Sequence, residues 1–274
     1  MMRVLCDLSL LAMVTVSCAS SCPSGCECID NEEECRHMVM CKNIKAFPPT
    51  YPTGTDCLFL QSPRLRRLTL EQKRAGLLAL PVSLKRLDMS ESRIGLLWEG
   101  CFEQLRELRV LNLEFSNLEA IPGHAFRGLS KLKVLWLTGN HYQPHEENYK
   151  SMERAGNRIR SVHKDAFVGL TSLQVLLMHH NRIQALDLEV FGDLRKLKVL
   201  KLLDNPIAKT LDVSSRIFDP IRVYCYQLDL TSDSGDELED YWEKTRTYLD
   251  DSWFQGPPSK KKRKRSKLQS ISDL

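Results

Sequence analysis

Residues 108–118 read LRVLNLEFSNL, and the spacing of apolar residues in this stretch recurs three more times before residue 208. In each copy, leucine or methionine stands at the first, fourth and sixth positions, serine or asparagine at the ninth, and a large apolar or aromatic residue at the eleventh. The copies are Leu108-Leu111-Leu113-Ser116-Leu118, Leu132-Leu135-Leu137-Asn140-Tyr142, Leu173-Leu176-Met178-Asn181-Ile183 and Leu197-Leu200-Leu202-Asn205-Ile207. One short strand cannot bury such leucines alone, so the copies must stack to form a shared core.

The interval between copies is constant over most of the chain. Counted at the sixth position, the steps from Met89 to Leu113, from Leu113 to Leu137 and from Met178 to Leu202 are equal in length. A second half follows each strand, with phenylalanine three positions ahead of leucine: Phe102 and Leu105, Phe126 and Leu129, Phe167 and Leu170, Phe191 and Leu194. An amphipathic helical bundle needs apolar residues every 3.6 positions, and these runs lack that period.

Together the two halves resemble the leucine-rich repeat. The resemblance covers residues 22 to about 207. It implies an α/β fold, a solenoid with a curved parallel sheet on its concave side and irregular or short helical segments on its convex side. The first repeat departs from the pattern, because Pro63 stands where asparagine is expected and the step from Leu60 to Met89 is longer than the regular one.

One interval contains an insertion. The step from Leu137 to Met178 exceeds the regular step by the length of the segment 141–157, and we assign the excess to that segment. Removing it joins Gly139-Asn140 to Arg158 and restores the pattern. Two interpretations stay open, an in-frame extension from a variant transcript or gene model, and a polar recognition loop. We predict no metal site there, because the histidines and glutamates of the insertion, His141, His145, Glu146 and Glu147, fix no complete ligand set.

The N-terminus predicts export. Residues 1–19 combine Arg3, an apolar run from Leu8 to Val16 and small residues at 17–19, as secretory signal peptides do. An uncleaved anchor is the alternative, although the apolar run is too short to cross a bilayer. No later stretch approaches the ~18 apolar residues that a spanning helix needs. We therefore expect a secreted, extracellular protein without a transmembrane segment.

Eight cysteines follow the signal peptide, and five of them lie within residues 22–41. Their arrangement resembles the cysteine-rich N-terminal cap of extracellular leucine-rich-repeat proteins, which covers the exposed edge of the first repeat. The resemblance implies two disulfides, Cys22 with Cys28 and Cys26 with Cys41. For the other cysteines we expect a Cys35–Cys57 bridge, a buried free thiol at Cys101 and an unpaired Cys225 open to intermolecular pairing.

The C-terminal part holds two tails of opposite charge. Residues 229–251 contain nine acidic and two basic side chains, a local charge of −7, and a basic run follows. Tyr241 and Tyr248 stand in acidic surroundings that favour tyrosine sulfation, although a plain solvated linker is the alternative. The basic run is a candidate patch for heparan sulfate or another anionic partner. A basic cleavage site before Ser266 and a contact with the acidic segment are the alternatives, whereas the signal peptide argues against nuclear import and against nucleic acid as a partner. The residues of the basic run are Lys260, Lys261, Lys262, Arg263, Lys264 and Arg265.

The chain divides into six parts. No paired cysteines follow Ile207, so another segment must close the solenoid. The parts are a signal peptide (1–19), an N-terminal cap (20–54), leucine-rich repeats (55–207) with the insertion (141–157), a candidate solenoid end (208–228), an acidic linker (229–258) and a basic disordered tail (259–274).

The alternation of each strand predicts which side chains face outward on the concave sheet. Among them Phe115, Trp136 and Leu177 are expected to form an exposed apolar centre flanked by charge, because aromatic anchors on rigid sheets are typical of binding surfaces. The full set of candidate ligand-binding residues is Glu91, Asn112, Glu114, Phe115, Trp136, Thr138, Leu177, His179, His180 and Lys201, with Phe59, Asp88 and Asp204 also facing outward.

No enzyme motif occurs in the chain. It has no Gly-x-Ser-x-Gly, His-Glu-x-x-His or phosphate-cradling glycine loop, and nothing pairs a nucleophile with a base. We therefore expect a non-enzymatic, secreted binding module without a cofactor, whose partner is a protein or an extracellular-matrix component. The alternative is a truncated or variant soluble form of a receptor ectodomain, acting as a decoy or without function.

Overall fold

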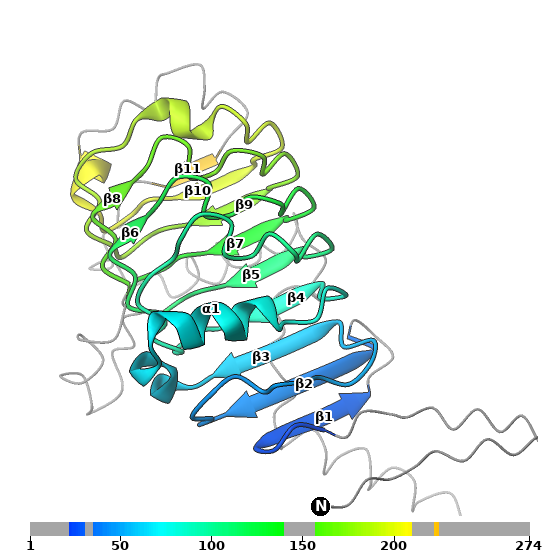
Figure 1. Ribbon diagram of the computed structural model, residues 1–274. Coiled ribbons are helices and arrows are strands. Elements are labelled where there is room, and N and C mark those ends of the chain that lie inside the picture. Colours follow the sequence, from blue (N-terminus) through cyan, green and yellow to red (C-terminus); the bar gives the residue numbers. More distant parts are fainter. Residues whose placement is uncertain (1–21, 31–34, 140–156, 210–221, 225–274) are drawn as a thin grey trace, which may run out of the picture.

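The computed structural model describes residues 22–30, 35–139, 157–209 and 222–224, and Figure 1 shows them as a curved stack of short strands. Within these residues nine strands form one sheet. Their order in the sheet is their order in the chain: β1 (Cys26–Asp30), β2 (His37–Lys42), β3 (Cys57–Gln61), β4 (Arg86–Asp88), β5 (Val110–Asn112), β7 (Val134–Trp136), β9 (Val175–Leu177), β10 (Val199–Lys201) and β11 (Arg222–Tyr224).

The sheet is parallel from β2 onward, and only β1 and β2 pair in antiparallel fashion. The middle leucine of each repeat pairs with the middle leucine of the next, so Leu87, Leu111, Leu135, Leu176 and Leu200 stand in one row. All five are 0% exposed. This row forms one wall of the core, and the predicted α/β solenoid with a parallel sheet is confirmed.

The convex side is built from short elements. Those that the structure describes are the 3-10 helices η1 (Pro63–Arg67), η2 (Leu188–Phe191) and η3 (Pro206–Lys209), the helix α1 (Leu70–Leu78), and a second sheet of β6 (Ala120–Ile121) and β8 (Ser161–Val162). The phenylalanines of the second half of each repeat stack behind the leucines. The ring centroids of Phe102 and Phe126 are 6.4 Å apart, and those of Phe126 and Phe167 are 6.0 Å apart.

The long first repeat accommodates its departure from the pattern with helical turns. Pro63 occupies the first turn of η1, where its missing N–H costs no hydrogen bond. The extra residues form α1, which begins at a capping box: the Gln72 N–H donates to the Thr69 hydroxyl, and the Thr69 N–H donates to the Gln72 side chain. The long interval is thus a repeat with one added helix.

Asparagines form a ladder on the turns after β7, β9 and β10. Asn181 is buried, and its amide donates to the carbonyls of Leu137 and Met178 while its side-chain oxygen accepts from the Ile159 N–H. Asn205 repeats this arrangement one turn later. Such bonds satisfy buried backbone groups that the turn leaves without partners.

The insertion sits in a different register from the predicted one. Asn157, 1% exposed, holds the ladder position: its oxygen accepts from Ser116 and Leu118, and its amide donates to the carbonyls of Leu113 and Thr138. The inserted stretch is therefore 140–156, not 141–157. Those residues lie outside the described part of the chain.

Ile159, which is 0% exposed, fills the apolar eleventh position of this repeat, as the junction obtained by removing the insertion predicts. Tyr142, which stands at this position in the uninterrupted sequence, lies outside the described residues. The two Gly-Asn pairs, at 139–140 and 156–157, make the registers equivalent in sequence. Gly139 directly precedes the insertion, and a Cβ there would lie 1.6 Å from the His180 carbonyl oxygen, so the backbone at this point admits no larger side chain.

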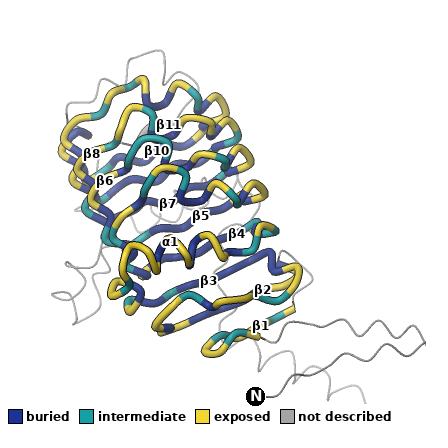
Figure 2. The backbone as a smooth tube through the Cα atoms, in the orientation of Figure 1, coloured by how far each residue is buried: buried dark blue, intermediate teal, exposed yellow. Residues whose placement is uncertain are grey.

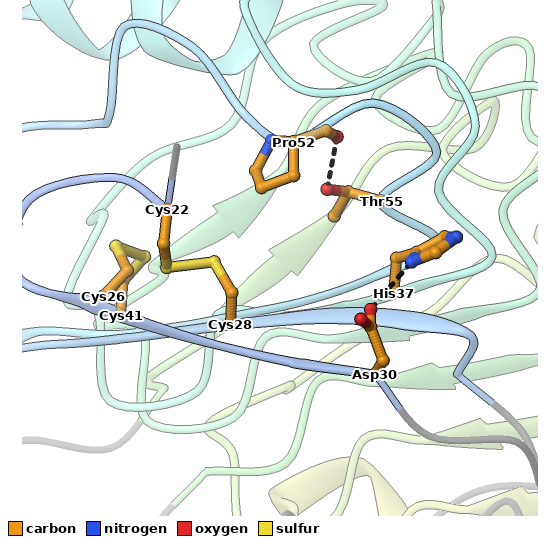
Figure 3. Close-up of a disulfide and its surroundings, with 8 residues drawn as sticks. All are labelled: Cys22, Cys26, Cys28, Asp30, His37, Cys41, Pro52 and Thr55. Carbon is orange, nitrogen blue, oxygen red and sulfur yellow. Dashed lines mark hydrogen bonds and ion pairs between the residues drawn. A yellow bond between two sulfur atoms is a disulfide. The ribbon is translucent and has the colours of Figure 1, made fainter. Parts of the chain in front are cut away.

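The N-terminal cap is held by disulfides. Cys22 joins Cys28 and Cys26 joins Cys41, the pairs implied by the family resemblance, and Figure 3 shows how they tie β1 to its surroundings. A third bridge links Cys35 to Cys57, as expected. Because β1 reverses direction, it closes the parallel sheet with an antiparallel edge.

Of the remaining cysteines, Cys101 lies within the described residues, and at the C-terminal end these residues include one further strand, β11. Cys101 is a buried free thiol, as predicted, and burial raises its pKa to about 12, so it is not reactive at neutral pH. At the far end, β11 pairs with β10 and adds a strand after the last recognised repeat. The predicted signal peptide, the sulfation candidates Tyr241 and Tyr248, Cys225 and the basic tail lie outside the described residues.

No helix in the described part of the chain is long and apolar enough to cross a membrane.

Candidate functional site

The concave face carries a second apolar cluster, separate from the main core. Strand alternation turns the leucines inward and their two neighbours outward. On four strands, β5, β7, β9 and β10, these neighbours pack together as one cluster. Its members are Val110, Val134, Trp136, Val175, Leu177 and Val199. We call these six residues the concave strip.

The predicted exposure of this surface is wrong. Trp136 is 9% exposed, and Leu177 and Lys201 are each 2% exposed. Asn112, Thr138 and His179 are also buried. Figure 2 shows β4, β5, β7 and β10 in the colour of buried residues, whereas many residues of the turns between strands are exposed or intermediate. Alternation fixes the face on which a side chain lies, whereas its exposure depends on everything that packs against that face.

Phe115 does not join Trp136 and Leu177. It lies on the turn after β5, has φ 51° and is partly exposed. The corresponding residues of the other repeats, Glu91, His180 and Asp204, also have positive φ, between 54° and 60°. These four residues form a row along the C-terminal edge of the sheet, which we call the turn row. The predicted apolar centre is therefore divided between a buried strip and an accessible edge.

A polar network begins beside the concave strip. The Ser90 hydroxyl donates to Asp88 at 2.6 Å, and the Asn112 amide donates to the second oxygen of Asp88 at 3.4 Å. The Asn112 oxygen in turn accepts from the Glu114 N–H. Farther along the face, the side chains of Thr138 and His179 approach to 3.5 Å.

Three predicted residues, Glu114, His180 and Lys201, lie close to charged or hydrogen-bonding groups. His180 Nδ1 lies 2.7 Å from Asp204 Oδ2 on the turn row. Burial raises the pKa of Glu114 to about 7, against opposing effects of the Thr138 and Asn112 hydrogen bonds and the Lys201 charge, and Asp88 raises it further. Burial lowers the pKa of Lys201 to about 7, and the Glu114 charge acts in the opposite direction.

These shifts predict that the free energy of unfolding has a minimum near pH 7. Between pH 4.5 and 7 the folded chain keeps the Glu114 proton that the unfolded chain loses, so stability falls as pH rises. Between pH 7 and 10.5 the unfolded chain keeps the Lys201 proton that the folded chain has released, so stability rises with pH. Urea titrations across this range measure the effect. The matched variant Glu114→Gln/Lys201→Met should lose the minimum, and a minimum that persists in the variant would contradict this origin.

Sequence reasoning overlooked two contributors to the concave face. The first is the valine ahead of the middle leucine in four repeats, at 110, 134, 175 and 199; its recurrence at the same position was a usable signal. The second is Arg86, whose guanidinium lies 5.4 Å from the centre of the Phe59 ring and 6.0 Å from that of Trp136. These contacts link β3 to the concave strip through cation–π attraction.

The described residues of the concave face could bind a partner through apolar contacts and hydrogen bonds, and they contain no group that could hold a metal ion. Within that part of the chain, no three histidine, cysteine, aspartate or glutamate side chains gather closely enough to hold an ion. What the concave face presents is an apolar strip bordered by hydrogen-bonding and charged groups.

Comparisons with known proteins agree with the repeats. Residues 82–141 and 155–207 match the Leucine rich repeat family. Podocan-like protein 1 of Mus musculus is 30% identical over 138 residues, 47% of this chain and 25% of that protein. Leucine-rich repeat-containing protein 3B of Homo sapiens is 27% identical over 163 residues, 59% of this chain and 44% of that protein.

A solved structure described as "Crystal structure of TLR13-ssRNA13 complex" is 24% identical, with a TM-score of 0.48, over 61% of this chain and 21% of that one. The chain spans less than half the length of each of these three proteins. The stacked repeats, the family match and the disulfide-bonded cysteines make this chain a leucine-rich-repeat protein with a cysteine-rich N-terminal cap.

Proposed function

We propose that the chain is a secreted binding module whose ligand, a protein or matrix component, is held on the concave face of the sheet. The observation that carries this proposal is the concave strip. The main core is already complete on the other side of the sheet, where it runs without interruption from the cap to the last repeat. A second contiguous apolar surface is therefore not needed to fill the solenoid, and we assign it to ligand binding.

The composition of the strip suits protein recognition. Trp136 and Leu177 supply apolar area beside Asp88, Asn112 and Lys201, which can fix the orientation of a partner through hydrogen bonds. Because the strip is 0–9% exposed, we expect a ligand to make its first contacts along the turn row, where Phe115 and His180 are accessible, and then to reach the strip.

Export is supported by the chemistry of the cap. Three disulfides within residues 22–57 persist in oxidising compartments and are rare in the cytosol. The predicted signal peptide at 1–19 agrees with this location. Heparan sulfate binding by Lys260 to Arg265 and sulfation of Tyr241 or Tyr248 remain proposals from the sequence alone.

The turn row offers a direct test through Phe115. Asparagine tolerates positive φ better than phenylalanine, so Phe115→Asn should leave the stability unchanged or slightly higher. We expect the same change to weaken ligand binding at least tenfold, about 1.4 kcal/mol, because it removes an accessible aromatic anchor. The measurement is a binding isotherm with the partner found by photo-crosslinking in conditioned medium, from a crosslinker placed at His180.

The matched control for this experiment lies on the convex side. Val168 is 39% exposed next to the buried Phe167, so a crosslinker at position 168 and the variant Val168→Asn probe the opposite surface. A partner captured equally from both positions, or one whose affinity falls with Val168→Asn and not with Phe115→Asn, would exclude the concave face as its site.

A further inference from the structure

The chain approaches five consecutive strands of the sheet through segments of similar sequence. These are the tripeptides ahead of β4, β5, β7, β9 and β10: Ser83-Leu84-Lys85, Glu107-Leu108-Arg109, Lys131-Leu132-Lys133, Ser172-Leu173-Gln174 and Lys196-Leu197-Lys198. The central leucine of each is 0–3% exposed and anchors the segment in the core. We call the residues on either side of these leucines the rim.

Backbone hydrogen bonds hold the rim in one column. The N–H of Arg109 donates to the Lys85 carbonyl, that of Lys133 to Arg109, that of Gln174 to Lys133 and that of Lys198 to Gln174, at 2.7 to 2.8 Å. Neighbouring strands lie about 4.8 Å apart, so this column places a side chain at every step of a line about 19 Å long. The spacing is a property of the backbone and does not depend on how the side chains happen to be oriented.

The rim is strongly cationic. It contains six basic side chains and one acidic side chain, a larger positive excess than the net charge of +4 that the whole chain carries. The basic residues are Lys85, Arg109, Lys131, Lys133, Lys196 and Lys198. Arg109, Lys131, Lys196 and Lys198 are exposed, and Lys85 and Lys133 are partly exposed. Positive charge is therefore concentrated along this column rather than spread evenly over the chain.

The pKa of Glu107, the one acidic residue of the rim, is lowered by the cations around it. Lys131 Nζ lies 2.6 Å from Glu107 Oε1. This contact lowers the pKa of Glu107, and the charges of Arg109 and Lys85 lower it further. Cations of three adjacent repeats thus act together on a single carboxylate. Beyond the rim, Asp56 lies ahead of β3 and pairs with Lys85 at 3.3 Å, which ends the cationic column at the cap.

The surroundings of these cations restrict the kind of partner. No aromatic side chain belongs to the rim, so it lacks the stacking platforms that single-stranded nucleic acids use. It contains no apolar side chain, and the leucines between its residues are buried, so it offers no apolar contact for the side chains of a peptide. The disulfides of the cap indicate an oxidising compartment. A linear, densely charged and apolar-free polyanion fits all three observations.

We propose that the rim binds a linear sulfated polysaccharide, with sulfate groups contacting the ammonium and guanidinium groups of four repeats, while Ser172 and Gln174 of the repeat of β9 add uncharged polar side chains. The site is separate from the concave strip, and it is also separate from the basic run at 260–265. It would let the solenoid attach to a matrix glycan while the concave face holds another ligand. Contacts of this kind are charge-assisted hydrogen bonds and weaken as salt is added.

Heparin binding by the full-length chain tests the proposal. Three variants, each neutralising basic side chains with glutamine, separate the candidate sites: Arg109→Gln/Lys133→Gln/Lys198→Gln on the rim, Arg160→Gln/Lys164→Gln/Arg182→Gln as a charge-matched control on exposed residues elsewhere, and a third in which residues 260–265 are neutralised. None of these variants replaces a buried leucine. An unchanged midpoint of urea unfolding checks that each variant folds.

The rim variant should bind heparin about tenfold or more weakly at physiological salt. The slope of log binding constant against log salt should fall by about two to three, because each cation that neutralises an anion contributes slightly less than one. The control variant should stay within about twofold of the unaltered chain. Equal losses in the rim and control variants would overturn the proposal, as would a loss confined to the 260–265 variant. Tighter rim-dependent binding of poly-glutamate or of an oligonucleotide than of heparin would overturn the choice of a polysaccharide.

Discussion

Replacing Asn157 with alanine should lower the free energy of unfolding by about 3 kcal/mol, because several buried backbone groups would lose their partner. The side chain is buried and serves four backbone groups in two neighbouring repeats, the N–H groups of Ser116 and Leu118 and the carbonyls of Leu113 and Thr138. Alanine would leave these groups buried without partners, at a cost of about 1–3 kcal/mol for each one that water cannot reach. Urea denaturation followed by circular dichroism measures the change.

The same experiment decides which Gly-Asn pair belongs to the solenoid. Asn181→Ala is the positive control, because Asn181 makes the same type of bonds one repeat later. Asn140→Ala is the negative control, and we expect it to change stability by less than about 0.5 kcal/mol, because Asn157 and not Asn140 makes the buried hydrogen bonds of the ladder. A large effect at Asn140 with a small one at Asn157 would reverse the register that the structure shows.

Replacing Phe126 with alanine should cost about 3–5 kcal/mol, the largest single loss we expect in this chain. The ring is 0% exposed and stacks between Phe102 and Phe167, with interplanar angles of 2° and 13°. Truncation removes apolar contacts, two aromatic pairs and the packing of three adjacent repeats together, and the repeats cannot collapse into the cavity without moving the sheet.

Two further variants serve as controls for Phe126→Ala. Phe126→Leu keeps most of the volume and should cost clearly less than Phe126→Ala. Val168→Ala, at a position that is 39% exposed, should change stability by less than about 0.5 kcal/mol. If Phe126→Ala cost no more than Val168→Ala, the phenylalanine stack would not be what joins the convex sides of the repeats. Because repeats contact only their neighbours, unfolding should also be followed with a second probe for loss of two-state behaviour.

The architecture of the repeats could be predicted from residue spacing. A constant period with leucines at fixed positions dictates which residues share a row, and the row of Leu87, Leu111 and Leu135 follows from it directly. The cap pairing came from family resemblance, and the same disulfides are present in the structure. The helix in the first repeat could not be predicted in this way. Thr69 and Gln72 form a capping box only when the residues between them adopt a helical turn, and no repeat spacing indicates that turn.

The candidate site was predicted only in outline. Strand alternation correctly placed Trp136 and Leu177 away from the main core, because the direction of a side chain is a local property of the strand. Their burial is not local, and the prediction of an exposed centre was wrong for that reason. Phe115 was misplaced because the strand ends before it and the backbone enters the left-handed region, which reverses the alternation on which its position was based.

The sequence by itself determined that this chain builds a leucine-rich-repeat solenoid, since the periodic pattern admits no other way to bury its leucines and phenylalanines. Only the tertiary structure decided between Asn140 and Asn157. The two Gly-Asn pairs are identical as local sequence, and the choice depends on which amide meets the carbonyls of Leu113 in the preceding repeat and of Thr138 in its own repeat. It likewise decided that cations from four repeats stand in one column, because hydrogen bonds between strands, and not neighbours in the chain, bring them together.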